Sequence, residues 1–103
     1  MSMLHQVLRN ASRCADLIRI SSAEVLSNEL LERGYSDCWM AYAHAATQVR
    51  RLMSRGQYQA SGRWLERRDG YGRARRAIWE EMVHRGMRHE APLPAPRLAS
   101  HAE

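Results

Sequence analysis

The sequence of 103 residues contains no lysine and no phenylalanine, and its three prolines all lie beyond residue 91. Proline lacks the backbone N–H that a helix needs, so its absence before that point leaves most of the chain free to form helices. With no phenylalanine, the core must be built from Met, Leu, Ala, Trp and Tyr. The expected fold is an all-α domain, a compact bundle of four to five short helices.

Cysteine is scarce, and long apolar runs are absent. Cys14 and Cys38 form no CxxC motif and are too few for a disulfide framework, which predicts two reduced, semi-buried thiols. No apolar run approaches the ~20 residues that cross a bilayer, and the N-terminal MSMLHQVLRN lacks the apolar region of a secretory signal. We therefore expect a cytoplasmic protein without a membrane partner.

Motifs for catalysis and metal binding are also missing. The sequence has no GxSxG, no P-loop, no HExxH and no GxGxxG after a strand, and its five histidines lack metal-ligand spacing. The DGYG stretch at 69–72 could bring backbone amides to a phosphate, but a helix end followed by a helix start explains both glycines more simply. We expect no enzymatic activity, no bound metal and no cofactor.

Hydrophobic periodicity and capping residues predict five helices within one domain, residues 1–87. The predicted helices span residues 3–20, 22–33, 37–55, 57–68 and 71–85. Ser21 and Glu24 fit a capping box at the start of the second helix. The last four helices are predicted to end at Gly34, Gly56, Gly70 and Gly86. The proline spacing of residues 88–103 predicts a flexible, extended tail.

Positive charge is concentrated in one segment of the chain. The net charge is +5, and residues 50–76 alone hold nine arginines against Glu66 and Asp69, giving +7. A GC-rich genome explains arginine in place of lysine, but it does not explain this clustering. The planar, five-donor guanidinium suits phosphate and carboxylate groups. The segment predicts a surface for an acidic partner, with an ordinary solvated helix face as the alternative.

The arginines of this segment recur at helical spacing, so each predicted helix has a basic edge. If these edges converge, the guanidinium groups and the interleaved aromatic rings form one patch that binds anionic groups. The predicted partner-binding residues are Arg50, Arg51, Arg55, Tyr58, Arg63, Trp64, Arg67, Arg68, Arg73, Arg75 and Arg76. For Trp64, a place in the core stays open as the alternative.

Two functions fit the basic segment. The first is a small non-enzymatic binding protein that regulates or inhibits a larger protein or nucleoprotein complex with an acidic surface. The alternative is direct binding of DNA or RNA by the same residues. A helix-turn-helix over residues 22–55 is disfavoured, because Asp37 would lead the recognition helix and repel phosphate.

Balanced charge outside residues 50–76 and an abundance of Met and aromatic side chains favour a protein partner. A second copy of the chain, forming a homodimer, is a further partner that the sequence allows. Short helical chains without motifs are frequent among phage and mobile-element regulators, including inhibitors of host defence complexes of the anti-CRISPR type. No residue motif in this chain matches such a family, so the hypothesis of a phage or mobile-element inhibitor rests only on the short length and helical, motif-free character of the chain.

Overall fold

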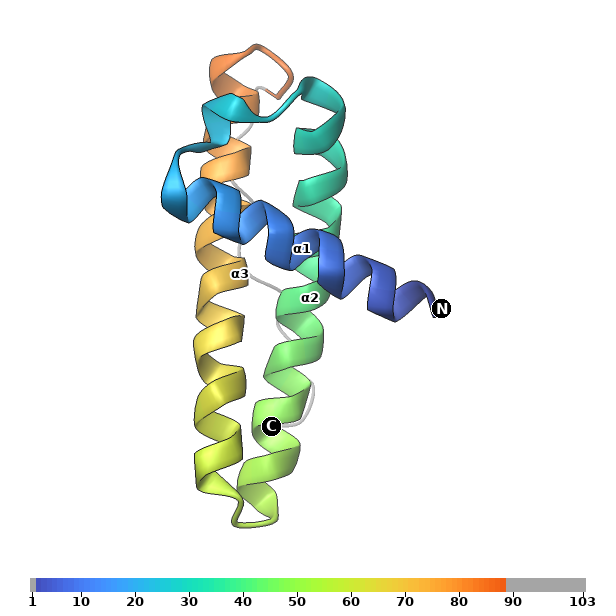
Figure 1. The fold of residues 1–103 in the computed structure, drawn as a ribbon, viewed down its shortest axis with the longest axis vertical. Coiled ribbons are helices and arrows are strands. Elements are labelled where there is room, and N and C mark those ends of the chain that lie inside the picture. Colours follow the sequence, from blue (N-terminus) through green and yellow to red (C-terminus); the bar gives the residue numbers. More distant parts are fainter. Residues whose placement is uncertain (1, 89–103) are drawn as a thin grey trace.

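The computed structural model describes residues 2–88, which form three α-helices and one short 3₁₀ helix. In chain order these are α1 (Met3–Ile20), η1 (Ala23–Val25), α2 (Asn28–Ser54) and α3 (Tyr58–His84). The helices α2 and α3 lie antiparallel as a long hairpin, and α1 crosses both on one side (Figure 1). The all-α prediction is confirmed, and residues 2–88 contain no strand. None of the helices in this range is long and apolar enough to cross a membrane.

The first helix, α1, spans the predicted residues 3–20. It begins where the hydroxyl of Ser2 accepts a hydrogen bond from the His5 amide at 3.1 Å. Its buried residues are Val7, Ala11 and Cys14, whose spacing of four and three places them on one stripe. Because these side chains are small, α1 packs closely against the hairpin.

The predicted start of the second helix at residue 22 is wrong. The hydroxyl of Ser22 accepts a hydrogen bond from the Glu24 amide at 3.2 Å, and this cap begins only the short η1. Leu26 follows in an extended conformation and is buried. A second cap then forms, in which the Ser27 hydroxyl accepts from the Leu30 amide at 3.2 Å and α2 begins. The extended backbone between the two caps directs the Leu26 side chain into the core.

Gly34 lies inside α2 and does not end a helix, contrary to the prediction. A Cβ atom at this position would lie 3.1 Å from the Sγ atom of Cys14 and 3.2 Å from the Cδ1 atom of Ile78. Glycine is therefore needed where α1 and α3 approach the backbone of α2, and not for a left-handed turn. The predicted helices 22–33 and 37–55 are replaced by η1 and one long helix.

Gly70 likewise lies inside a helix, so the predicted helices 57–68 and 71–85 are one helix of 27 residues, α3. Each internal glycine costs about 1 kcal/mol relative to alanine. One face of α3, however, is buried from Tyr71 to Met82, and tertiary packing outweighs that local cost. The predicted count of four to five helices is wrong, because residues 2–88 form three α-helices and one short 3₁₀ helix.

The predicted helix ends at Gly56 and Gly86 are confirmed. Their φ angles are 73° and 77°, in the left-handed region that favours glycine. The hairpin therefore turns sharply between α2 and α3. Of the predicted tail, residues 88–103, only Arg88 lies within the described residues, where its guanidinium donates to the carboxylate of Glu32.

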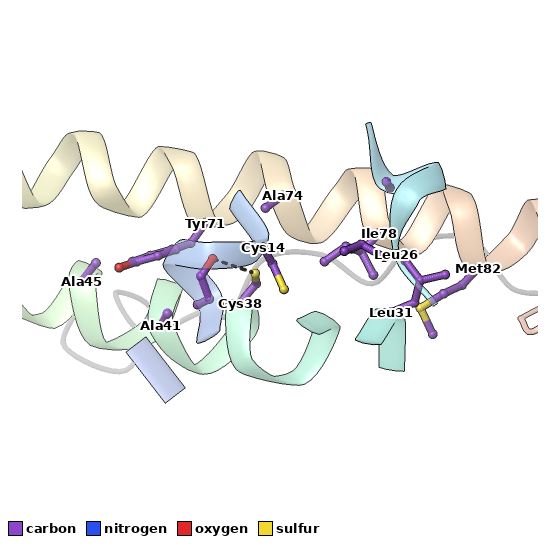
Figure 2. Close-up of a cluster of buried hydrophobic side chains, with 12 residues drawn as sticks. Cys14, Leu26, Leu31, Cys38, Ala41, Ala45, Tyr71, Ala74, Ile78 and Met82 are labelled. Carbon is purple, nitrogen blue, oxygen red and sulfur yellow. Dashed lines mark hydrogen bonds between the residues drawn. The ribbon is translucent and has the colours of Figure 1, made fainter. Parts of the chain in front are cut away.

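The core lies where the three α-helices meet (Figure 2). Its largest fully buried side chains are Leu31, Cys38, Ile78 and Met82. Alanines continue the cluster along α2, beside the ring of Tyr71. The buried cluster is concentrated toward the start of α2 and the end of α3, and the hairpin tip contributes little to it.

Both cysteines are free thiols in this core. The thiol of Cys38 donates to the carbonyl of Ala11 at 3.9 Å, which links α2 to α1. Burial raises the pKa of Cys38 to about 12 and also raises the pKa of Cys14. Both thiols therefore stay protonated at neutral pH and act as packing residues, not nucleophiles.

Candidate functional site: the groove between α1 and α3

A cavity of about 710 Å³ lies between α1 and α3, and we call it the α1–α3 groove. Its apolar lining consists of Leu8, Ala15 and Ile18 from α1 and Trp64, Ala74 and Ala77 from α3. Three of these six side chains are alanines, so the two helices leave space where larger residues would close it. The groove exists because α1 crosses α3 on small side chains.

Four arginines and one carboxylate also line the groove. They are Arg9, Asp16 and Arg19 of α1 and Arg67 and Arg73 of α3, which together carry a net charge of +3. The α1 members share one helical stripe, since they are seven and three residues apart. Asp16 lies 3.8 Å from Arg19, and both side chains are largely exposed, so this ion pair is weak. The rim of the groove is therefore predominantly cationic.

Trp64 forms one wall of the groove and holds an arginine in place. The guanidinium carbon of Arg67 lies 4.7 Å from the centroid of its ring, a cation–π contact. On the α2 side, the imidazole of His44 meets the ring edge to face, with centroids 5.4 Å apart. Trp64 is half-buried, so it both packs against the core and lines the groove.

A pair of hydroxyl groups joins the two helices beside the apolar lining. The oxygen atoms of Ser12 and Tyr71 are 3.2 Å apart, and either can be the donor. Both residues line the groove, and the Tyr71 side chain is buried. This pair fixes α1 on α3 and supplies the groove with neutral hydrogen-bonding groups.

A second cavity of about 440 Å³ lies along α3 and is lined mainly by α3 residues, with Tyr42 contributed by α2. Its lining includes three of the predicted arginines, Arg73, Arg75 and Arg76, together with Asp69 and Glu80. The carboxylates leave this lining closer to neutral than the α1–α3 groove. Arg73 lines both cavities, whereas Arg67 lines only the groove, and Arg75 and Arg76 line only the second cavity.

Arg75 is not part of an exposed patch, contrary to the prediction. Only 4% of the residue is exposed. Its guanidinium carbon lies 5.3 Å from the ring centroid of Trp39 and 6.0 Å from that of Tyr35, so the charge rests on the aromatic side chains of α2. Arg75 therefore joins α3 to α2 and is not available to a partner outside.

The other predicted residues differ in how accessible they are. Eight of the eleven predicted residues are exposed, namely Arg50, Arg51, Arg55, Tyr58, Arg63, Arg67, Arg73 and Arg76. Arg51 and Arg55 lie near the hairpin tip, outside the residues that line the groove. Arg68 is half-buried and donates to the neighbouring carboxylate of Asp69 at 3.0 Å. Among the predicted arginines, Arg67 and Arg73 are the two that the fold brings into the α1–α3 groove.

Sequence reasoning missed the contribution of α1, since it counted charge within one continuous segment. Arg9, Ser12 and Arg19 lie far from residues 50–76 in sequence and reach α3 only when α1 crosses it. A signal was present: with Asp16 they recur at intervals of three, four and three, a polar stripe along one side of an amphipathic helix.

Within residues 2–88, no three His, Cys, Asp or Glu side chains are grouped to hold a metal ion. Comparison with known proteins finds no matching family model, no curated protein of significant similarity and no solved structure of significant similarity.

Proposed function

We propose that this protein is a small, non-enzymatic helical module that regulates or inhibits a larger protein by binding an acidic surface on it. The docking surface is the rim of the α1–α3 groove extended by Arg63, which lies one helical turn before Arg67. Its members are Arg9, Arg19, Arg63, Arg67 and Arg73, and we call them the basic surface. The module acts by covering part of the partner.

The observation that carries this proposal is the lack of internal neutralisation on the basic surface. Apart from the long, exposed pair between Arg19 and Asp16, none of its arginines forms an ion pair within residues 2–88. Elsewhere in this range Arg68, Arg85 and Arg88 are paired with carboxylates, while Arg51 and Arg55 near the hairpin tip form no ion pair but lie outside the lining of the α1–α3 groove. Like charges held together repel one another, so an acidic partner stabilises this arrangement.

The position of the groove supports a protein partner over a nucleic acid. Protein interfaces have an apolar centre surrounded by a polar rim, with arginine and aromatic residues enriched. The α1–α3 groove provides the apolar centre, Trp64 the aromatic anchor, and the arginines the rim. A surface for the nucleic-acid backbone needs no such apolar centre.

The test uses two triple variants with the same change in net charge. The first reverses the α3 part of the basic surface (Arg63→Glu, Arg67→Glu, Arg73→Glu), and the matched control reverses exposed arginines outside it (Arg51→Glu, Arg55→Glu, Arg76→Glu). Each tagged protein is used to capture its partner from extracts of the native host, with and without nuclease. We expect the first variant to lose the partner, the control to retain it, and both to keep the helical circular-dichroism signal.

Two results would contradict the proposal. Equal loss of binding in both variants would show that net charge alone matters. A partner released by nuclease, with an affinity that falls by about 0.9 log units per log unit of salt for each phosphate contacted, would indicate direct nucleic-acid binding instead.

A further inference from the structure

We propose that the α1–α3 groove binds a small amphipathic organic anion, an apolar body that carries one carboxylate or a comparable anionic head group. This inference goes beyond the docking of an acidic protein and does not depend on it. It rests on the volume of the groove, the character of its walls and the placement of its charges.

The volume and lining of the groove fit a small molecule. Small-molecule sites typically have volumes of about 300–1,000 Å³, with mainly apolar walls and a few polar groups, and the groove measures about 710 Å³. The helices are fixed across it by the hydroxyl pair of Ser12 and Tyr71, 3.2 Å apart. Ala15 and Ala77, which are half-buried, leave the space that the apolar body would fill.

The charges of the groove select an anion. Asp16, the one carboxylate of the lining, is already beside Arg19, which leaves Arg9, Arg67 and Arg73 for the head group. None of these three forms an ion pair within the described residues. A cation would be repelled by the net positive charge, and a neutral molecule would leave that charge uncompensated.

One of these arginines is held in position before any ligand arrives, and a second has room at the rim. The guanidinium of Arg67 is held on the ring of Trp64 at 4.7 Å. That of Arg73 lies back over Gly70, with its Nη2 atom 4.0 Å from where a Cβ atom would be. Gly70 itself lines the groove, so its missing side chain leaves this guanidinium room at the rim. A guanidinium held in place can bind a carboxylate through two parallel hydrogen bonds.

The test compares three ligands that share one apolar body: decanoate, 1-decanol and decyltrimethylammonium. Each is titrated into the full chain and followed by two-dimensional NMR, with the indole N–H of Trp64 and the amide of Ala77 as reporters. We expect decanoate to bind one molecule per chain in saturable fashion, at least tenfold more tightly than the alcohol. The ammonium compound should bind least.

Two variants distinguish the contribution of the anionic head group to binding from that of the apolar body. Arg67→Gln with Arg73→Gln changes exposed side chains, and should weaken decanoate binding at least tenfold with little effect on decanol. Ala77→Leu narrows the groove and should weaken both ligands. As a matched control, Arg51→Gln with Arg55→Gln should leave decanoate binding unchanged.

The inference is overturned if decanoate binds no better than decanol, or if the Arg67→Gln, Arg73→Gln variant binds it as well as the wild type. Perturbations that grow without saturation, or that centre on residues outside the groove, would also overturn it. The acidic-partner proposal is tested separately, by capture of the partner from host extracts. If the wild type binds decanoate but captures no acidic protein, the acidic-partner proposal has failed. If it captures such a protein but does not bind decanoate, the groove proposal has failed.

Discussion

Gly34 and Gly62 both lie inside long helices, but their surroundings differ. A Cβ atom at Gly62 would meet nothing within 4 Å, whereas one at Gly34 would press on the buried side chains of Cys14 and Ile78. We expect Gly62→Ala to stabilise the protein by about 1 kcal/mol through helix propensity. Gly34→Ala should destabilise it by roughly 1 kcal/mol, because overpacking outweighs the same propensity gain.

Chemical denaturation of the two glycine variants measures this difference directly. Because both substitutions add one methyl group to a helix, each controls for the other. Equal stabilisation by the two would show that the three helices do not need glycine at their closest approach.

Cys38 makes stability depend on pH in the alkaline range. Its pKa is raised by burial from 9.0 to about 12, so the folded state keeps the thiol protonated while the unfolded state ionises first. The resulting stability is complete below pH 9 and is lost as the pH rises toward 12. Between pH 8 and pH 10 we expect a loss of roughly 1 kcal/mol from this residue.

Urea denaturation of the wild type and Cys38→Ala at pH 8 and pH 10 tests this expectation. The variant is less stable at both values, because it leaves a cavity, but its loss between them should be smaller. An identical loss in the two proteins would remove Cys38 as the cause.

At the scale of elements, Arg85 at the C-terminus of α3 joins three segments. Its guanidinium donates to the carboxylate of Glu81 at 2.7 Å, to the side-chain oxygen of Asn28 at 2.9 Å and to the carbonyl of Glu24 at 3.0 Å. We expect Arg85→Ala to destabilise the protein by about 2 kcal/mol, because it removes three hydrogen bonds from a charged donor, of which the one to Glu81 is partly buried. The exposed Arg33→Ala serves as control, with an expected change within about 0.5 kcal/mol.

Thermal denaturation of the Arg85 and Arg33 variants supplies the measurement. If Arg85→Ala unfolds at the same temperature as Arg33→Ala, the three hydrogen bonds contribute no net stability. In that case packing alone holds η1 and the start of α2 against α3.

The elements show which features a sequence can predict. The bounds of α1 follow from its apolar stripe, and Gly56 and Gly86 end helices as local turn chemistry requires. Gly34 could not be placed from the sequence, because its role depends on contacts between distant segments. Gly70 lies inside α3 although no other segment comes within 4 Å of where its Cβ atom would be. A glycine that ends a helix and a glycine that admits a neighbouring helix look alike in sequence.

The candidate site was predictable only in part, for a related reason. Arginine spacing singled out Arg67 and Arg73, which do line the groove. It also singled out Arg75, which is buried beneath aromatic rings of α2. The expected convergence assumed three short helices; in one continuous α3, arginines a few residues apart point to different sides, since each residue turns the helix by about 100°. The contribution of α1 required its crossing position.

At the scale of the whole molecule, α1 is attached less firmly than α2 and α3 are to each other. Its interface uses small side chains, the long hydrogen bond from the Cys38 thiol to the Ala11 carbonyl, and two hydrogen bonds between side chains, one between Ser12 and Tyr71 and one between Asn10 and Asp37 at 2.6 Å. Large apolar residues at its ends, including Met3 and Ile20, are exposed. We expect α1 to open in native-state hydrogen exchange before the hairpin unfolds.

This opening connects stability to the groove, because α1 provides one of its two walls. The double variant Asn10→Ala, Tyr71→Phe removes the two hydrogen bonds between side chains and should speed exchange of the α1 amides about tenfold or more, the effect of about 1.4 kcal/mol lost from the closed state. Amides in the middle of α2 should change less. A ligand held between α1 and α3 should slow exchange in α1 selectively, since it binds only the closed arrangement. Uniform exchange across the three helices, with or without the double variant, would mean that the protein unfolds as one unit and that the groove does not open through α1.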